Sequence, residues 1–301
     1  MLTDKTINPE KVREFGSALH FKYSTALSVA KPMWSELAME VPSTGSANTY
    51  KWFGDLPGIR EWIGDRVINA LGKFKITIEN KPFENTVAID KDDFEDDEHL
   101  GQSVIATAMG TQAAMFPDKL TYGLLKEGFS TKCYDGQNFF DTDHPVLDAD
   151  GNTVSVSNSG GGSGKPWFLL DATKGYLPLI FQKRRAFSFQ SFSNMQDFEV
   201  FKSKKFYFGT DGRMNVGFSL WQLMYGSKQP LNADNFKAAR KEMSLFPKDG
   251  GEPLGITASV LFVGPSLVDE AEDLMKKKKV DGGDTNTLHN AIKIVVIPEL
   301  G

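Results

Sequence analysis

Three neighbouring side chains offer the most direct candidate chemistry in this sequence. Asp141, Asp143 and His144 stand within four consecutive positions, and two carboxylates beside an imidazole could bind a metal ion or act as an acid/base pair. A hydrolytic metal site needs several protein ligands that converge, and the other histidines are scattered along the chain: His20, His99 and His289. Aspartates in a turn before a proline commonly cap their own backbone. A metal-dependent hydrolase is therefore kept only as the less favoured alternative, and no metal ligand is assigned.

A glycine-rich run, residues 157–164, ends in Gly164-Lys165 and could be taken for a phosphate-binding loop. That motif requires glycine where Ser159 stands and a serine or threonine where Pro166 stands. The run is therefore predicted to be a flexible connector.

The remaining candidates also favour structural roles. Cys133 is the only cysteine, so it cannot form an internal disulfide and a reducing compartment is the default. A lone cysteine is more often a small buried residue than a nucleophile. The lysines at 276–279 stand where a helix C-terminus favours cations, before an Asp-Gly-Gly turn. We therefore expect no catalytic residues, no cofactor and no enzyme activity.

Composition narrows the class of protein. The 301 residues contain 34 Lys and Arg against 39 Asp and Glu, a net charge of −5, which argues against a dedicated nucleic-acid-binding protein. No secretory signal is visible at the start, and no run approaches the length of a membrane span. The 23 phenylalanines predict extensive aromatic burial, within the core or between chains.

The first element is predicted to be a helix. Asn8 is a suitable N-cap and Pro9 suits the first helical position. Val12, Phe15 and Leu19 then recur at helical spacing.

Residues 50–90 are predicted to form a β-ribbon. Strand-like pieces at 75–78 and 86–89 alternate with turn signals, and large aromatic residues stand beside charges over 50–66. Since an isolated ribbon of this kind is marginal in water, we expect it to lie on another surface.

An acidic run, residues 92–98, precedes a long helical pattern. Carboxylates in a first helical turn are favourable with the helix dipole, which explains their position without a ligand. Leu100, Val104 and Ala108 are predicted to share an apolar face, and Gly128 suits the C-terminal end. We predict one long helix over about 95–127.

The second half is predicted to combine short strands with two helices. Strands are expected at 167–170, 179–181, 198–201, 206–208 and 292–297. One helix is expected over 232–246, and Ser266 with Asp269 would form the capping box of another that ends near residue 279. The fold class is mixed α+β.

Several blocks resemble a known family, the Mu-like phage major head subunits. The densest are Trp52-Phe53-Gly54, Arg60-Glu61-Trp62-Ile63-Gly64-Asp65-Arg66, Phe83-Glu84-Asn85-Thr86, Tyr134-Asp135-Gly136-Gln137 and Phe139-Phe140-Asp141-Thr142-Asp143-His144-Pro145. Later blocks are Trp167-Phe168-Leu169-Leu170-Asp171 and Gly217-Phe218-Ser219-Leu220-Trp221-Gln222. The likeness covers nearly the whole chain.

The resemblance implies the tailed-phage major capsid protein fold. Its parts would be an N-terminal arm, an extended loop (the β-ribbon), a peripheral domain with a long spine helix, and an axial domain. The arm would be 1–49 and the extended loop 50–90. The peripheral domain would be 91–128 with 166–227, and the axial domain 129–165 with 228–301.

The implied function is a major capsid protein that self-assembles into hexamers and pentamers of an icosahedral shell around double-stranded DNA. The implied partners are other copies of itself, a scaffold or protease, a portal and decoration proteins. DNA would be contacted weakly and non-specifically, no membrane would be involved, and the virion would assemble in the host bacterial cytoplasm. An encapsulin-like compartment shell is the nearer alternative.

Charged and aromatic residues of the ribbon are the candidate contacts between subunits. Their charges have few obvious partners within one subunit, and a neighbour could supply them while the tryptophans exclude water. The candidates are Trp52, Asp55, Arg60, Trp62, Asp65 and Arg66.

Overall fold

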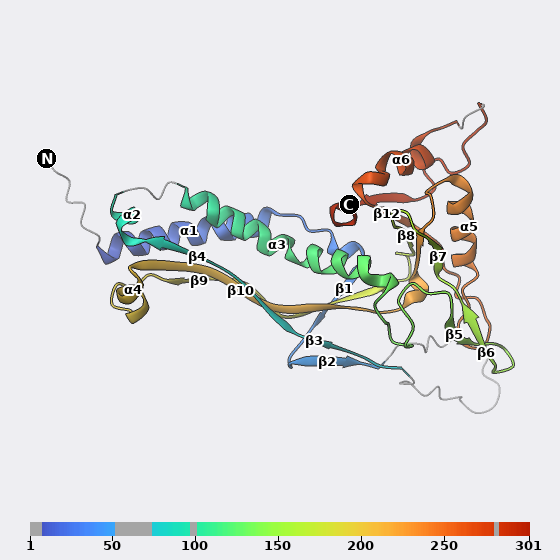
Figure 1. Cartoon of the computed structure of the whole chain (residues 1–301), viewed down its shortest axis with the longest axis horizontal. Coiled ribbons are helices and arrows are strands. Elements are labelled where there is room, and N and C mark those ends of the chain that lie inside the picture. The colour runs from blue at the N-terminus through green and yellow to red at the C-terminus, as the bar shows by residue number, and fades with distance from the viewer. Residues whose placement is uncertain (1–7, 52–73, 97–100, 280–282) are drawn as a thin grey trace.

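A long four-stranded sheet and a shorter five-stranded sheet divide the molecule along its length (Figure 1). The computed structural model describes residues 8–51, 74–96, 101–279 and 283–301. The helices are α1 Pro9–Val29, α2 Lys91–Glu95, α3 Gln102–Lys126, α4 Phe198–Ser203, α5 Ala233–Ser244 and α6 Val268–Lys276. Short 3-10 turns include η1 Trp34–Glu36, η2 Glu127–Phe129, η3 Trp221–Leu223, η4 Pro265–Leu267 and η5 Pro298–Leu300.

The strands, in chain order, fall into four sheets. They are β1 Ala38–Pro42, β2 Ala47–Tyr50, β3 Ile76–Glu79, β4 Lys81–Asp90, β5 His144–Leu147, β6 Thr153–Val156, β7 Ser159–Gly162, β8 Trp167–Leu170, β9 Leu179–Phe192, β10 Lys205–Phe218, β11 Met224–Lys228, β12 Val260–Val263 and β13 Lys293–Val296. The long sheet has the order β1-β9-β10-β4, the second β13-β12-β8-β11-β7, and two hairpins pair β2 with β3 and β5 with β6.

Helices α1 and α3 lie together along one face of the long sheet (Figure 1). Alternate residues of β10 are buried, as a strand with one covered face requires. Phe208 packs edge-on against Phe15 of α1 with ring centroids 5.9 Å apart, and the Tyr23 hydroxyl lies 2.6 Å from that of Thr210. The helix layer is thus tied to the strand through both apolar and polar contacts.

The predicted start of α1 is confirmed. The Asn8 side chain accepts a hydrogen bond from the Lys11 amide at 2.8 Å, with Pro9 in the first turn. Val12 and Leu19 are buried at the predicted spacing, and Tyr23 continues their row.

The long helix differs from its prediction in extent and in orientation. The acidic residues Asp92 and Asp93 lie in the first turn of α2, whereas α3 begins at Gln102 and runs unbroken past Pro117. The predicted apolar face was wrong: Val104 is 69 % exposed. In the first half of α3 the buried residues are small or flexible, Ala106, Met109, Gly110 and Ala113, because α1 approaches closely on that side.

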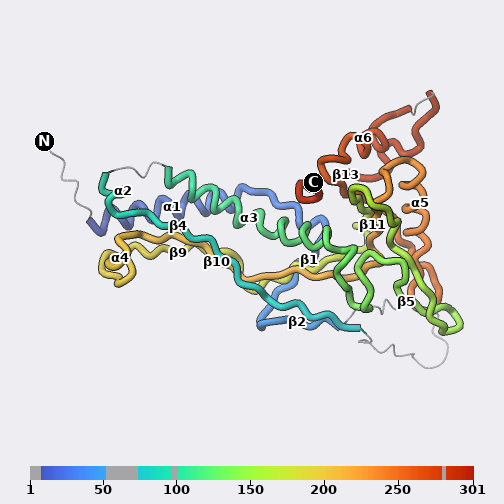
Figure 2. The backbone as a smooth tube through the Cα atoms, in the orientation of Figure 1, coloured from blue at the N-terminus to red at the C-terminus, as the bar shows by residue number. Residues whose placement is uncertain are grey.

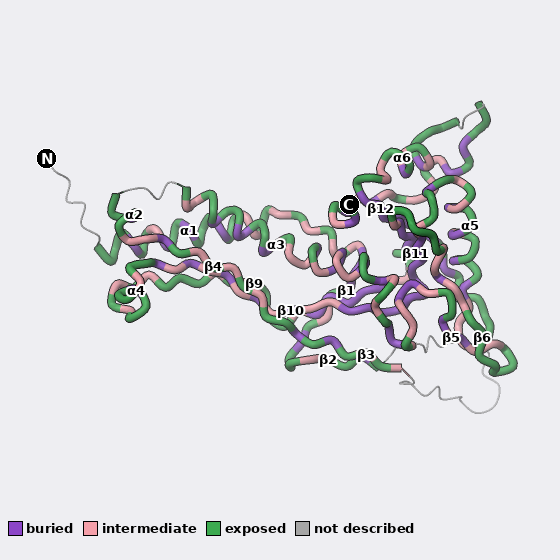
Figure 3. Tube along the Cα trace, viewed as in Figure 1, coloured by how far each residue is buried: buried purple, intermediate pink, exposed green. Residues whose placement is uncertain are grey.

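The five-stranded sheet holds the most deeply buried part of the molecule (Figure 3). Every residue of β8 and of β12 is buried, the continuous apolar pattern of a strand covered on both faces. The helix predicted over 232–246 is α5, which has Asn232 as its N-cap and buries Phe236, Ala239 and Met243. The strand predicted at 167–170 is β8. It pairs with β12 and β11 and does not belong to the sheet of β9 and β10, the strands that follow it in the chain.

Three local predictions were wrong. Residues 198–201 lie in helix α4 rather than in a strand, because the chain turns there between β9 and β10. The glycine-rich run contains β7, since its glycines let the backbone lie close to β11. The Ser266 hydroxyl donates to the carbonyl of Gly301 at 2.7 Å instead of capping α6. Within the described part of the chain, none of the helices is both long and apolar enough to cross a membrane.

The packing of α1 on α3 yields a matched pair of glycine substitutions. A Cβ on Gly110 would clash with the carbonyl oxygen of Tyr23 and lie 3.0 Å from Cβ of Ala26, so Gly110→Ala should destabilise the subunit by about 1–3 kcal/mol. Gly123, in the same helix, has nothing within 4 Å of that position, so Gly123→Ala should stabilise by about 1 kcal/mol. Urea unfolding followed by circular dichroism measures both, and equal effects would contradict the close packing.

Candidate functional site

The predicted ribbon, residues 50–90, begins in a described hairpin of β2 with β3 and ends in β4, a strand of the long sheet. Strands β2 and β3 pair antiparallel with Tyr50 opposite Ile76, so residues 51–75 connect the two strands of one hairpin that leaves the long sheet (Figure 2). The later ribbon strand, β4, instead pairs with β10 along its whole length. The candidate contact residues lie outside the described residues: Trp52, Asp55, Arg60, Trp62, Asp65 and Arg66.

A buried amide of β9 holds the base of this hairpin. The side-chain oxygen of Gln182 accepts from the Tyr50 hydroxyl at 2.8 Å. Its nitrogen donates to the carbonyl of Ile78 at 3.0 Å and to the side-chain oxygen of Asn80 at 2.9 Å. Gln182 is fully buried, so these partners take the place of water around its side chain.

The network continues into the loop before β2. Asn80 donates from Nδ2 to Ser43 Oγ at 2.7 Å and to the carbonyl of Gly45 at 3.0 Å. Ser43 Oγ donates in turn to Asn48 Oδ1 at 2.8 Å. Both strands of the hairpin are therefore fastened to β9 through Gln182.

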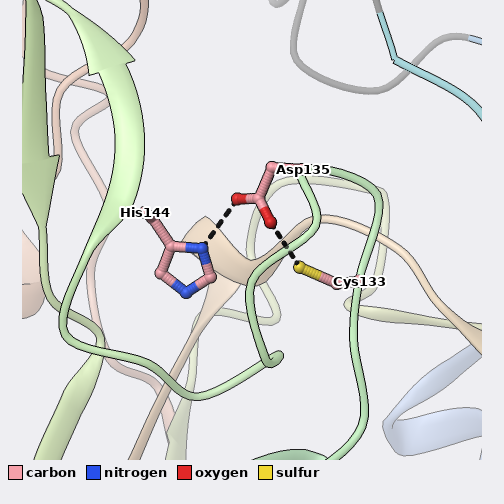
Figure 4. Close-up of side chains that lie close together, drawn as sticks. All are labelled: Cys133, Asp135 and His144. Atoms are coloured by element: carbon pink, nitrogen blue, oxygen red, sulfur yellow. Dashed lines mark hydrogen bonds and ion pairs between the residues drawn. The ribbon is translucent and has the colours of Figure 1, made fainter.

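The structure separates the three residues singled out as chemistry candidates. The Asp141 carboxylate accepts from the backbone amides of Asn138 at 3.1 Å and Thr142 at 2.8 Å, the local capping role expected of a turn aspartate. His144 points away, toward Asp135. Among the described residues, the possible metal ligands that lie together are Cys133, Asp135 and His144 (Figure 4).

His144 has a contact partner at each ring nitrogen and on its ring face. Its Nδ1 lies 2.7 Å from Asp135 Oδ2 and its Nε2 lies 3.1 Å from Asn158 Oδ1, while its ring stacks on Trp221 with centroids 4.0 Å apart. Asn158 donates from Nδ2 to the carbonyl of Phe139 at 2.8 Å, which identifies its oxygen as the acceptor facing His144. Both ring nitrogens of His144 thus face oxygen acceptors.

Asp135 lies between the imidazole and the thiol (Figure 4). Burial opposes its ionisation, but the hydrogen bond and positive charge of His144 outweigh burial and hold the pKa of the Asp135 carboxyl below its usual range. Burial, followed by the charge of Asp135, raises the pKa of the Cys133 thiol, which donates to Asp135 Oδ1 at 3.1 Å. Cys133 is therefore a buried thiol at neutral pH and not a nucleophile. Because His144 is fully buried, it cannot contact a substrate.

Exposed apolar side chains form a feature that sequence reasoning missed. Phe198 and Phe201 of α4 are 71 % and 77 % exposed, and Phe192 at the end of β9 is 58 % exposed. They lie at the end of the molecule remote from the five-stranded sheet (Figure 3). The phenylalanine count was the available signal, because a single subunit does not bury all of these rings.

The hydrogen bonds of Gln182 predict that a substitution at this position of β9 destabilises the subunit, whereas the same substitution at an exposed position of β9 does not. Gln182→Met keeps the volume but removes the hydrogen bonds of Gln182 to Tyr50, Ile78 and Asn80, and losing such buried hydrogen bonds costs about 1–3 kcal/mol. Gln190→Met, on the exposed part of the same strand, should change stability by under about 0.5 kcal/mol. Urea unfolding of the unassembled subunit tests the pair, and a Gln182→Met protein as stable as the wild type would show that the network is not required.

The chain is similar to phage head proteins along almost its entire length. The family described as Mu-like prophage major head subunit gpT matches residues 12–300. The major capsid protein of Escherichia phage Mu is 36 % identical over 293 residues, which cover 95 % of this chain and 96 % of that protein. The Mu-like prophage FluMu major head subunit of Haemophilus influenzae is 36 % identical over 279 residues, covering 90 % and 91 %.

Solved phage particles show the same fold. The matching chain in the procapsid of bacteriophage JBD30 superposes with a TM-score of 0.84 at 36 % identity, covering 96 % of this chain and 99 % of that chain. The JBD30 capsid chain superposes with a TM-score of 0.76 at 29 % identity, covering 94 % of each. The predicted tailed-phage capsid fold is thereby confirmed. The extent of the family match and of the identity to its members establishes that this chain is a phage major capsid protein and belongs to the family of Mu-like prophage major head subunits, gpT.

Proposed function

We propose that many copies of this chain assemble into the hexamers and pentamers of an icosahedral head that encloses double-stranded DNA. The observation that supports this most is the likeness to the JBD30 procapsid chain over nearly the whole of both chains. The hairpin of β2 and β3 adds a physical reason, because a hairpin whose two strands are fastened to β9 can support a contact with a neighbour. A closed shell of identical subunits requires such directed contacts.

The domain division is part of this proposal. The arm is 1–49 and the extended loop 50–90. The peripheral domain contains the spine helix α3 with strands β9 and β10, and the arm and the loop add the edge strands β1 and β4 to the same sheet. The axial domain contains 129–165 and 228–301, and we add β8 and β11 to it because both pair within the five-stranded sheet. The prediction from sequence had placed these two strands in the peripheral part, 166–227.

The partners and location follow from the same proposal. The JBD30 capsid is decorated with minor capsid protein trimers; by analogy, this chain would carry decoration proteins and would work with a scaffold or protease and a portal. Assembly would take place in the host bacterial cytoplasm. The protein's role would be structural and not enzymatic, and neither the encapsulin-like shell nor the hydrolase finds support in the comparisons.

The ribbon charges provide the direct test of assembly. Asp65→Ala and Arg66→Ala, made separately, should leave the subunit folded by circular dichroism yet block or weaken shells seen by negative-stain electron microscopy. An exposed ion pair is worth about 0–1 kcal/mol, whereas removing one partner of a buried pair costs about 3–5 kcal/mol. Because the contact would be repeated in every copy of a shell, even about 0–1 kcal/mol for each pair would affect the stability of the shell.

The matched control removes a charge from an exposed pair within one helix. Lys276→Ala breaks the contact of Lys276 with Glu272 in α6 and should leave shells unchanged. If both ribbon variants assemble like the wild type, or if either unfolds the subunit, the ribbon does not form the contact proposed. If the wild-type protein forms no particles at any concentration, the proposed assembly itself is wrong.

Affinity for DNA should be weak. A subunit with a net charge of −5 has no overall attraction for phosphate, so any binding should be non-specific and should weaken with salt. Filter binding with unrelated duplexes at low and physiological salt measures this. Tight binding of one sequence that survives high salt would contradict it.

A further inference from the structure

The buried cluster of Cys133, Asp135 and His144 brings together a thiol, a carboxylate and an imidazole, the three ligand types that zinc binds in proteins (Figure 4). Their ligand atoms all lie within 4.8 Å of one another. Zinc bonds of about 2.0–2.3 Å in tetrahedral geometry separate neighbouring ligand atoms by roughly 3–4 Å, so small movements would bring all three onto one ion. We propose that these side chains bind one divalent transition-metal ion of the zinc type, a structural site independent of the proposed assembly function.

The orientation of the imidazole supports this site. A metal-binding histidine normally donates its second ring N–H to a fixed oxygen. Nε2 of His144 has such a partner in Asn158 Oδ1 at 3.1 Å, and Asn158 is fixed by donating to the carbonyls of Phe139 and Met224. Nδ1 is thereby turned toward Asp135 and Cys133, where the ion would lie.

The carboxylate has the placement of a central ligand. Oδ2 of Asp135 faces His144 at 2.7 Å and Oδ1 faces Cys133 at 3.1 Å, so each oxygen is directed at one of the other two ligands. One of the two oxygens could bind the ion, so that the three side chains supply three of its ligands. The Asp135 side chain is only 2 % exposed, so water does not compete for it freely.

The charges balance without any change of oxidation state. In the metal-free cluster, the Asp135 carboxylate accepts one hydrogen bond from the thiol and one from Nδ1 of His144. On binding, these two protons leave to solvent, and the ion takes their place between a thiolate, a carboxylate and a neutral imidazole. The two negative ligands then neutralise the double charge of the ion.

The ion would fasten one loop to its neighbours. Cys133 and Asp135 belong to the turn after η2, His144 begins β5, and Asn158 directly precedes the edge strand β7. Complete burial of His144 leaves no access for a substrate, so the site would stabilise the fold rather than catalyse a reaction.

Cobalt provides a specific probe, because the chain has a single cysteine. The full-length protein should be produced in minimal medium with Co²⁺ in place of zinc, so that the ion is present while the chain folds. We expect about one equivalent of Co²⁺ by elemental analysis and a thiolate-to-cobalt charge-transfer band in the near ultraviolet. Zinc-loaded protein should melt at a higher temperature than protein treated with a chelator.

Two variants separate this site from incidental binding. Cys133→Ser should abolish the charge-transfer band while its far-ultraviolet circular dichroism stays that of the wild type. His20→Ala removes an exposed histidine of α1 that is remote from the cluster, and it should keep both the band and the cobalt content. Bound cobalt without the band would show surface binding only and would overturn the proposal. Wild-type protein that contains no cobalt would also overturn it, whether or not Cys133→Ser folds.

Discussion

The antiparallel pairing of β9 with β10 is the constraint on which the rest of the molecule depends. Each strand has 14 residues, and the register runs from Phe218 opposite Leu179 at one end to Tyr207 opposite Phe192 at the other (Figure 1). One face of the pair carries α1 and α3, its edges carry β1 and β4, and β11 of the second sheet follows shortly after its end. The pair extends from α4 at one end of the molecule to the five-stranded sheet at the other (Figure 1).

Buried polar groups give this scaffold its specific geometry. Gln182 fixes the hairpin base through partners more than 100 residues away in sequence, and His144 fixes the loop beside β5 through Asp135 and Asn158. A buried amide or imidazole that loses its partners is costly, so alternative positions of these segments are strongly disfavoured. Apolar packing alone would tolerate small shifts, whereas a hydrogen bond tolerates few.

The surface of the subunit carries several large apolar side chains that its own chain does not bury. Val104 on α3 and Phe198 and Phe201 on α4 are largely exposed, although apolar side chains of this size are usually buried within a subunit. Val104 belongs to the apolar face that the sequence predicts for the long helix, but its side chain is not packed into the core of its own chain. In a protein whose family builds heads from many copies, an apolar row can be buried by a neighbour instead of by the subunit.

The sequence by itself determined the local elements and the family. Asn8 and Pro9 specify the start of α1, the continuous apolar run at 167–170 specifies a buried strand, and the dense motif blocks identify a major head subunit. Only the tertiary structure decided which faces are buried, that 198–201 turns into a helix, and that His144 lies against Asp135 and not Asp141. Periodicity reports that a face is apolar but not what covers it, and side chains that meet across a fold leave no signature in their spacing, because chain folding and not sequence distance brings them together.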